Sequence, residues 1–201
     1  MAGDVQPNIV TRFLREYFLK PGTIGAVVPS SKALAAEMVD WLELDAATAV
    51  LEYGPGTGPF TETLLPRLAP QCRFVMIELN PVFVELLREK FPGRTIVQDS
   101  VAHARKICDQ HGIGYADCIL SGLPWASFPE ALQRDCLDAM MNVLRPGGQF
   151  VTFAYLPALV TPAARRFRKM LRVYFSSVSP SRTIWNNLPP AFVYRCRKRS
   201  G

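Results

Sequence analysis

A glycine-rich turn with a carboxylate in front of it is the feature of this 201-residue chain that could most directly do chemistry. The segment from Leu51 to Gly58 reads Leu-Glu-Tyr-Gly-Pro-Gly-Thr-Gly and follows the short apolar run Thr48–Val50. Glycines adopt positive φ without a Cβ penalty and let the backbone approach a ligand closely. The carboxylate of Glu52 can attract an ammonium group. The pattern therefore predicts a ligand-binding turn between a strand and a helix.

The spacing of the glycines separates two classes of ligand. Dinucleotide-binding turns use G-x-G-x-x-G, with the amides of a helix N-terminus facing a pyrophosphate. Here Gly54, Gly56 and Gly58 follow G-x-G-x-G, and an acid stands two residues before the first glycine. This layout is similar to the one in which class I methyltransferases hold S-adenosylmethionine.

Further acids stand at the ends of predicted strands, where ligands bind in a doubly wound sheet. Glu78 closes the second strand, where a carboxylate can accept hydrogen bonds from both ribose hydroxyls. Asp99, with the amide of Ser100, closes the third strand and can meet the adenine edge. The acids at three successive strand ends therefore all indicate the same cofactor site. The residues predicted to bind the cofactor are Glu52, Tyr53, Gly54, Gly56, Thr57, Gly58, Glu78, Leu79, Asp99, Ser100 and Ser121.

The segment Ser121-Gly-Leu-Pro-Trp125 closes the fourth predicted strand and is expected to face the reacting methyl group. Methyl transfer from a sulfonium needs the nucleophile in line with the methyl–sulfur bond, which proximity and orientation supply. An amine nucleophile must also lose a proton to a nearby acceptor. The rings of Trp125 and Tyr155 can hold a methylated cation, although aromatics beside a parallel sheet are usually core. The predicted catalytic residues are Tyr17, Ser121, Gly122, Leu123 and Tyr155.

Alternating strands and helices from Ala47 onward must position these residues. The strand candidates are Thr48–Tyr53, Arg73–Glu78, Thr95–Gln98, Asp117–Leu120 and Gln149–Ala154. The helix candidates between them are Phe60–Leu68, Pro81–Lys90, Val101–Gln110 and Pro129–Leu144. After a basic helix near Pro162–Leu171, Val173–Val178 and Phe192–Cys196 complete the sheet. This order predicts an α/β, Rossmann-like fold: a seven-stranded, mostly parallel sheet with helices on both faces and an antiparallel last strand.

Residues 1–45 are expected to form a helical extension to a catalytic domain that spans 46–201. One face of the first helix carries an apolar stripe at helical spacing, made of Ile9, Val10, Phe13, Leu14, Tyr17 and Phe18. Ser30 or Ser31 is expected to cap a second helix, from about Lys32 to Leu42. An aromatic–aliphatic stripe with basic neighbours is typical of a helix on an anionic lipid surface. Packing of the stripe against the domain is the alternative.

Composition and charge limit the classes of function. The net charge is +6, and basic residues gather at 165–172 and 195–199, so anionic lipids and nucleic acids are both possible partners. Five cysteines without a C-x-x-C pair predict reduced thiols, and two histidines without ligand spacing predict no metal site. No run approaches 18 apolar residues and no secretory signal pattern is present. We therefore expect a cytoplasmic protein, peripheral to the inner face of the membrane.

Motifs along nearly the whole chain resemble the bacterial phospholipid N-methyltransferases that act on phosphatidylethanolamine. The specific matches are Gly25-Ala-Val-Val-Pro-Ser-Ser31, Ser121-Gly-Leu-Pro124 and Asn187-Leu-Pro-Pro-Ala191. The glycine turn, Ile77-Glu-Leu-Asn80 and Leu144-Arg-Pro-Gly-Gly148 also match. The resemblance implies that S-adenosylmethionine is the cofactor, that the N-terminal helix lies on the bilayer, and that an ethanolamine headgroup is methylated up to three times. A role for Asn187–Ala191 does not follow from the sequence.

Other functions stay open. RNA adenine methyltransferases also carry a glycine turn and a motif like Leu123-Pro124-Trp125, and their basic surface binds RNA. Against that function, they have an asparagine where this chain has Gly122, and they add a helical C-terminal domain. We therefore expect no nucleic-acid partner. A binding protein with an inactive site is disfavoured because every cofactor acid is present, and an ornithine lipid is an alternative acceptor.

Overall fold

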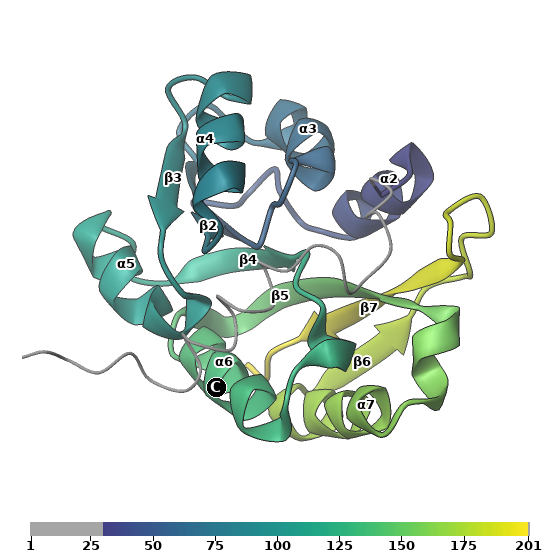
Figure 1. Cartoon of the computed structure of the whole chain (residues 1–201). Coiled ribbons are helices and arrows are strands. Elements are labelled where there is room, and N and C mark those ends of the chain that lie inside the picture. Colours follow the sequence, from purple (N-terminus) through teal and green to yellow (C-terminus); the bar gives the residue numbers. More distant parts are fainter. Residues whose placement is uncertain (1–29, 201) are drawn as a thin grey trace, which may run out of the picture.

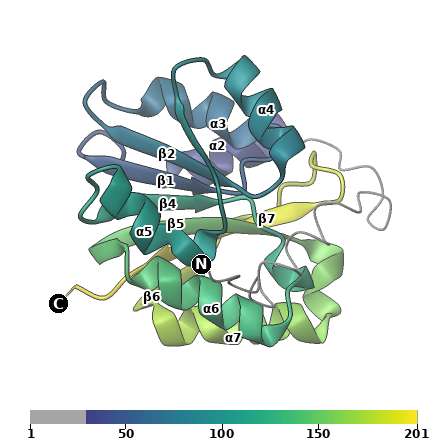
Figure 2. The same cartoon turned by 60° about the vertical axis from the view of Figure 1, so that its left-hand side comes forward.

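The computed structural model describes residues 30–200, and they form a single twisted sheet between two layers of helices (Figures 1 and 2). The strand order is β3-β2-β1-β4-β5-β7-β6. The strands are β1 Ala49–Tyr53, β2 Arg73–Glu78, β3 Thr95–Gln98, β4 Ala116–Ser121, β5 Leu144–Tyr155, β6 Ser177–Pro180 and β7 Ala191–Arg197. Strands β1 to β5 pair in parallel, and β7 is antiparallel to both of its neighbours. The predicted fold class is confirmed.

The helices divide between the two faces of the sheet, as Figure 2 shows. One layer holds α2 Lys32–Asp40, α3 Pro59–Leu64 and α4 Pro81–Lys90, and the other holds α5 Ala104–Gln110, α6 Glu130–Met141 and α7 Pro162–Tyr174. Short 3-10 turns are η1 Leu65–Arg67, η2 Val101–His103, η3 Trp125–Ser127 and η4 Leu156–Val160. This double cover explains why the central strands are apolar on both faces.

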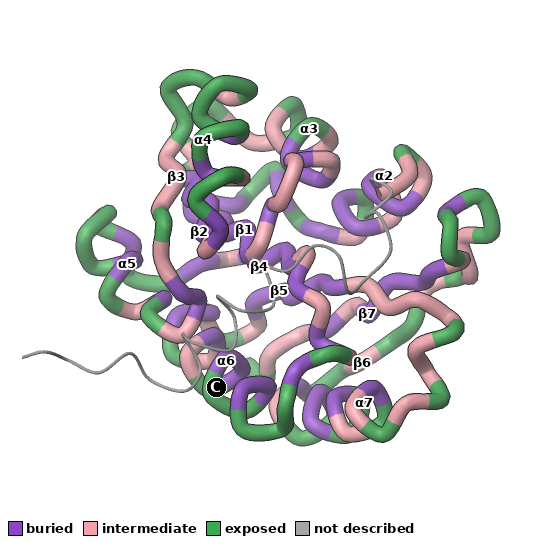
Figure 3. Tube along the Cα trace, in the orientation of Figure 1, coloured by how far each residue is buried: buried purple, intermediate pink, exposed green. Residues whose placement is uncertain are grey.

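In strand β1, successive side chains point to opposite faces of the sheet. All five of its residues are buried. Leu51 joins the core beneath α5, α6 and α7, whereas Val50 joins the core beneath α2, α3 and α4. Glu52 lies on the same face as Val50, because alternate residues of a strand point the same way. Figure 3 shows this buried centre and the exposed outer surfaces of the helices.

Element boundaries differ from the predicted ones where local sequence interrupts the pattern. Helix α3 ends at Leu64, because Pro66 lacks the N–H that a continuing α-helix needs, and η1 follows. Helix α7 continues to Tyr174, so the strand predicted from Val173 begins only at Ser177. Ser31 is confirmed as the cap of α2: its Oγ accepts the amide of Leu34 at 3.2 Å.

Several predictions for the N-terminal extension lie outside the described residues. They include Tyr17 and the rest of the apolar stripe of the first predicted helix. Helix α2 itself packs against α3 and β7. Between residues 30 and 200, no helix is both long and apolar enough to cross a bilayer.

Candidate active site

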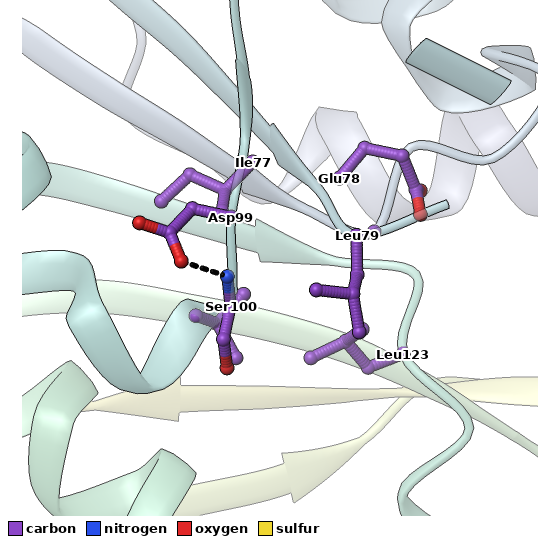
Figure 4. Close-up of a pocket in the computed structure, with 8 residues that line it drawn as sticks. Ile77, Glu78, Leu79, Asp99, Ser100 and Leu123 are labelled. Atoms are coloured by element: carbon purple, nitrogen blue, oxygen red, sulfur yellow. Dashed lines mark hydrogen bonds between the residues drawn. The ribbon is translucent and has the colours of Figure 1, made fainter. Parts of the chain in front are cut away.

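The carboxyl ends of β1 to β4 meet at one edge of the sheet. Tyr53, the last residue of β1, pairs with Ile77 in β2 and with Ser121 in β4, and Glu78 pairs with Gln98 in β3. The polar residues that follow each strand therefore come together. A small pocket at this edge is shown in Figure 4 and is lined by Gly54, Ile77, Glu78, Leu79, Asp99, Ser100, Val101 and Leu123.

The glycine turn has the backbone that its sequence predicts. Gly54, Gly56 and Gly58 have φ of 64°, 59° and 81°. A Cβ at Gly54 would lie 2.6 Å from the Leu123 side chain, whereas a Cβ at Gly56 would meet nothing within 4 Å. A Cβ at Gly58 would likewise lie 2.6 Å from the Phe91 ring, so positive φ and two close approaches require glycine. The turn is open at Gly56, where a ligand can reach its backbone.

Gly122 allows the β1 and β4 loops to touch. Its amide donates to the carbonyl of Tyr53 at 2.8 Å. A Cβ at Gly122 would stand 2.5 Å from the carbonyl oxygen of Gly54, which is too close for any side chain without a backbone shift. The predicted catalytic role of Gly122 is therefore, in this geometry, one of close packing against the glycine turn.

Glu78 links the glycine turn to the end of β2. It is 1% exposed, and its Oε2 accepts the amide of Gly56 at 3.1 Å while Oε1 accepts the amide of Asn80 at 2.9 Å. Burial raises the pKa of this carboxyl, and the backbone amides oppose that shift. Each oxygen of a carboxylate has more than one lone-pair site, so both can also accept ribose hydroxyls.

Asp99 is held at the pocket by two groups. Its Oδ1 accepts the amide of Ser100 at 2.7 Å, which Figure 4 shows, and lies 2.7 Å from Nδ1 of His103. These contacts use one carboxylate oxygen and leave the other for a ligand. His103 was not among the predicted site residues; it follows Asp99 by four residues at the start of a helix, and this spacing is the signal that could have indicated the contact.

Glu52 lies behind the glycine turn, under α3. It is fully buried, and its Oε2 accepts the hydroxyl of Thr61 at 2.7 Å. Its Oε1 has no hydrogen-bond partner among residues 30–200. Burial raises the pKa of Glu52 to about 8; the Thr61 hydroxyl opposes this shift, and Glu78 adds to it. A buried acceptor without a partner fits a ligand that brings a donor or a cation.

The side chain of Tyr53 does not reach the pocket, although the sequence predicts that this residue binds the cofactor. Its ring is fully buried on the opposite face of β1 from Glu52, and its hydroxyl has no partner in the described part of the chain. Strand alternation explains the error, since neighbouring residues point to opposite faces. Tyr53 contributes its carbonyl, as described above. Thr57 contributes a carbonyl that accepts the ammonium of Lys90 at 2.9 Å.

Trp125 is a core residue, so its predicted role as a cage for a methylated cation is wrong. It is 2% exposed and stacks on Phe167 with 4.8 Å between ring centroids. Its Nε1 donates to Oγ of Ser121 at 3.0 Å, and Ser121 also accepts the amide of Leu123 at 3.3 Å. Ser121 therefore shapes the β4 loop. Gln133 of α6 donates to the Trp125 carbonyl at 2.7 Å and holds the loop from the other side.

The remaining predicted site residues lie at or near the same edge. Leu79 and Leu123 form the apolar wall of the pocket. Tyr155 ends β5 and is half-buried, with its ring edge-on to Phe153 at 5.2 Å. Across residues 30–200, no group of three His, Cys, Asp or Glu side chains is placed to hold a metal ion, and the five cysteines are free thiols.

Comparisons with known proteins agree with this geometry. A methyltransferase-domain family model matches residues 50–148. The chain is 36% identical, over 92% of its length and 94% of the relative's, to an ornithine lipid N-methyltransferase from Singulisphaera acidiphila. A Burkholderia thailandensis 1,6-didemethyltoxoflavin N1-methyltransferase, solved with S-adenosylhomocysteine, superposes with a TM-score of 0.64 at 18% identity, covering 100% of this chain and 93% of that one.

A match to an RNA-modifying enzyme covers less of both chains. Ribosomal RNA small subunit methyltransferase A from a Hydrogenobaculum species is 31% identical over 85 residues, which are 42% of this chain and 33% of the relative. These 85 residues amount to less than half of the chain, whereas the lipid-modifying relative aligns over nearly all of it.

Proposed function

Because the chain belongs to the bacterial lipid N-methyltransferases, within the class I S-adenosylmethionine-dependent methyltransferases, we propose that it methylates the amine headgroup of an aminolipid. The observation that carries this proposal is the 36% identity to an ornithine lipid N-methyltransferase over nearly the full length of both chains. Ornithine lipid is therefore the first acceptor to test. Phosphatidylethanolamine, which the sequence motifs favour, is the second.

The residues at the sheet edge fit S-adenosylmethionine. Bound there, this cofactor supplies an electrophilic methyl group on a sulfonium. In this proposal the Glu78 carboxylate accepts the ribose hydroxyls, and the second oxygen of Asp99 accepts a donor from the adenine edge. The unpartnered Oε1 of Glu52 suits the ammonium of the methionine part. These contacts would orient the cofactor for methyl transfer.

The acceptor amine is protonated in water near neutral pH, so it must lose a proton before or during transfer. We propose that the acceptor enters beside the loop 121–125, whose shape depends on Ser121 and Gln133. Among the described groups, the backbone carbonyls of 121–123 can accept a hydrogen bond from the ammonium, and the Tyr155 hydroxyl is the candidate for receiving its proton. A carbonyl can only orient the ammonium, whereas a hydroxyl can pass the proton on.

We propose that the protein acts at the inner surface of the membrane as a peripheral protein. Helix α7 supports this location: it buries Phe167 and Leu171 and exposes Arg168, Lys169 and Arg172. A helix with an apolar buried face and a basic outer face attracts anionic lipid surfaces. The predicted interfacial helix at the N-terminus, which lies outside the described residues, is the second element proposed for this contact.

The proposal is tested by offering methyl-labelled S-adenosylmethionine with ornithine-lipid vesicles, phosphatidylethanolamine vesicles and unmodified ribosomal RNA in parallel. Label in either aminolipid supports the proposal and identifies the acceptor. Glu78→Gln should lower the rate by about tenfold or more, because glutamine cannot accept hydrogen bonds at both positions. The matched control is Tyr115→Ser, which changes an exposed residue at the opposite sheet edge. Label in RNA alone contradicts the proposal.

The RNA alternative is kept as an arm of that experiment because of the partial match to a ribosomal RNA methyltransferase. One observation counts against it. The asparagine expected at position 122 in such enzymes would place its Cβ 2.5 Å from the Gly54 carbonyl here. Position 122 in the β4 loop of this chain therefore has room for glycine only.

A further inference from the structure

The loop between β6 and β7 exposes two large apolar side chains beside the active-site edge. Trp185 and Leu188 are each 74% exposed. The loop spans residues 181–190 and returns into β7 at Ala191, which pairs with Tyr155 at the end of β5. It therefore lies at the same edge of the sheet as the glycine turn. In Figure 1 it is the yellow loop that projects beyond α2, and Figure 3 shows most of it exposed.

The loop is anchored so that these side chains stay outside. Asn187, between them, is 3% exposed; its Oδ1 accepts the amide of Ser31 at 2.9 Å and its Nδ2 donates to the carbonyl of Pro189 at 2.7 Å. Ile184 and Ala191 exchange two backbone hydrogen bonds, of 2.7 and 3.3 Å. The loop thus buries an amide and exposes an indole, which is the reverse of the usual distribution for a surface in contact with water.

Along the sequence, the charged residues that flank the loop are all basic, and in space Glu37 of α2 pairs with one of them, Arg195 of β7. Asp138 is the last acidic residue of the chain, so residues 139–201 carry Arg and Lys but no Asp or Glu. Arg182 is exposed within the loop itself. The preceding turn η4 begins against the loop, where the Leu156 amide donates to the Pro190 carbonyl at 2.9 Å, and it ends at Val160, which is 71% exposed. Helix α7 follows directly with its exposed basic residues.

We propose that the segment Trp185–Leu188 inserts into the headgroup–acyl boundary of an anionic bilayer and places the active-site edge against the membrane. The proposal rests on the proposed function as a lipid methyltransferase. Tryptophan is suited to this boundary because its ring is apolar and its N–H is polar, and leucine adds buried apolar area. Arg182 in the loop and the exposed basic residues of α7 suit anionic headgroups. Insertion at the active-site edge shortens the path of a lipid headgroup to the cofactor.

The first test measures binding to phosphatidylcholine vesicles that contain an anionic phosphatidylglycerol fraction. Trp185→Ser and Leu188→Ser should each weaken binding by roughly tenfold, since each removes one apolar anchor. The matched control, Tyr115→Ser, removes an aromatic residue that is 59% exposed and precedes β4 at the opposite edge; it should bind as the wild type does. Equal binding by Trp185→Ser and the wild type, with thermal melts that coincide, overturns the proposal.

The second test follows tryptophan emission when vesicles are added. The wild type should shift to shorter wavelength and be quenched by lipids brominated at shallow positions, and Trp185→Ser should lose both changes. The other two tryptophans are Trp125, buried in the core, and Trp41, half-buried at the end of α2; the Trp185→Ser variant measures their combined background. No shift in the wild type overturns the proposal. The proposal is also overturned if the emission maximum of Trp185 lies at short wavelength before vesicles are added, because a segment of the chain itself then covers the loop.

An assay of methyl transfer to the aminolipid in detergent micelles distinguishes failure of the insertion proposal from failure of the proposed function. There Trp185→Ser should retain the wild-type rate, because the substrate no longer has to leave a bilayer. An equal loss of rate in micelles and in vesicles overturns the insertion role. If the wild type methylates no aminolipid in any format, the proposed function fails, and vesicle binding still decides whether the loop inserts.

Discussion

The side chain of Asn187 accepts a hydrogen bond from the backbone amide of Ser31 at 2.9 Å, across 156 residues of sequence. Ser31 in turn caps α2 through the amide of Leu34. Two motifs with no evident connection in the sequence, one ending at Ser31 and the other beginning at Asn187, therefore meet at one point. The contact joins the start of α2 to the loop that exposes Trp185, so it fixes the position of both.

Asn187→Ala is expected to lower the free energy of unfolding by about 1–3 kcal/mol, because it leaves the Ser31 amide without its partner. Asn187→Asp should recover part of this loss, since a carboxylate still accepts from Ser31 but cannot donate to Pro189. Urea titration followed by circular dichroism measures both. The control is Asn186→Ala, at the exposed neighbouring position. Equal stability of the Asn187→Ala and Asn186→Ala variants contradicts the prediction.

Gly122→Ala is expected to weaken binding of S-adenosylhomocysteine by roughly tenfold or more. The added Cβ would stand 2.5 Å from the Gly54 carbonyl, and the glycine turn must shift to relieve that contact. Isothermal titration calorimetry gives the affinity. Gly114→Ala serves as the control, because a Cβ there meets nothing within 4 Å and its φ is not in the left-handed region. Wild-type affinity in Gly122→Ala would show that the two loops do not depend on each other.

The pKa of Glu52, raised to about 8 by burial, predicts a pH-dependent stability. Its unfolded value is near 4.5, so between about pH 4.5 and 8 the folded state holds a proton that the unfolded state releases. Stability from this group is therefore full at low pH and falls as the pH rises through that window. Glu52→Gln should remove this slope and become more stable relative to the wild type between pH 5 and 8, at about 1.4 kcal/mol per pH unit as an upper bound.

Chemical unfolding at several pH values measures that difference. Parallel pH profiles of the two proteins would show that Glu52 does not titrate in this range. Above about pH 8, where Glu52 is ionised, the same variant should bind S-adenosylhomocysteine more weakly, because a neutral amide lacks the charge that attracts an ammonium. Stability and affinity thus change in opposite directions, which a general packing defect would not produce.

His103→Ala is expected to reduce the affinity for S-adenosylhomocysteine by roughly three- to tenfold, because Asp99 loses one of the two groups that hold it. The loss should be smaller for the analogue with a 6-keto purine, which has no amino group to donate to Asp99. Calorimetry with both ligands makes the comparison. His111→Ala, at an exposed histidine at the end of α5, is the control. An equal loss for both ligands would place the effect of His103 away from the adenine edge.

Some of this site follows from sequence alone. Glycines at 54, 56 and 58 and acids at 52, 78 and 99 were placed at strand ends by local pattern, and parallel strands bring such ends to one edge whatever their order. Other features of the site depend on the face of the sheet to which a side chain points. Tyr53 was predicted in the pocket, yet alternation along β1 points its ring into the core. Trp125 was considered for a cation cage, but Phe167 of α7 covers it.

The α/β fold class and the cofactor motif could be predicted from the sequence, because hydrophobic periodicity and glycine requirements are local properties of the chain. The tertiary structure alone decided the partners of individual side chains. The Ser31–Asn187 contact, the unpartnered oxygen of Glu52 and the outward position of Trp185 each depend on segments far apart in sequence. Burial and hydrogen bonding are set by packing between elements, and no local pattern encodes which distant residue arrives at a given atom.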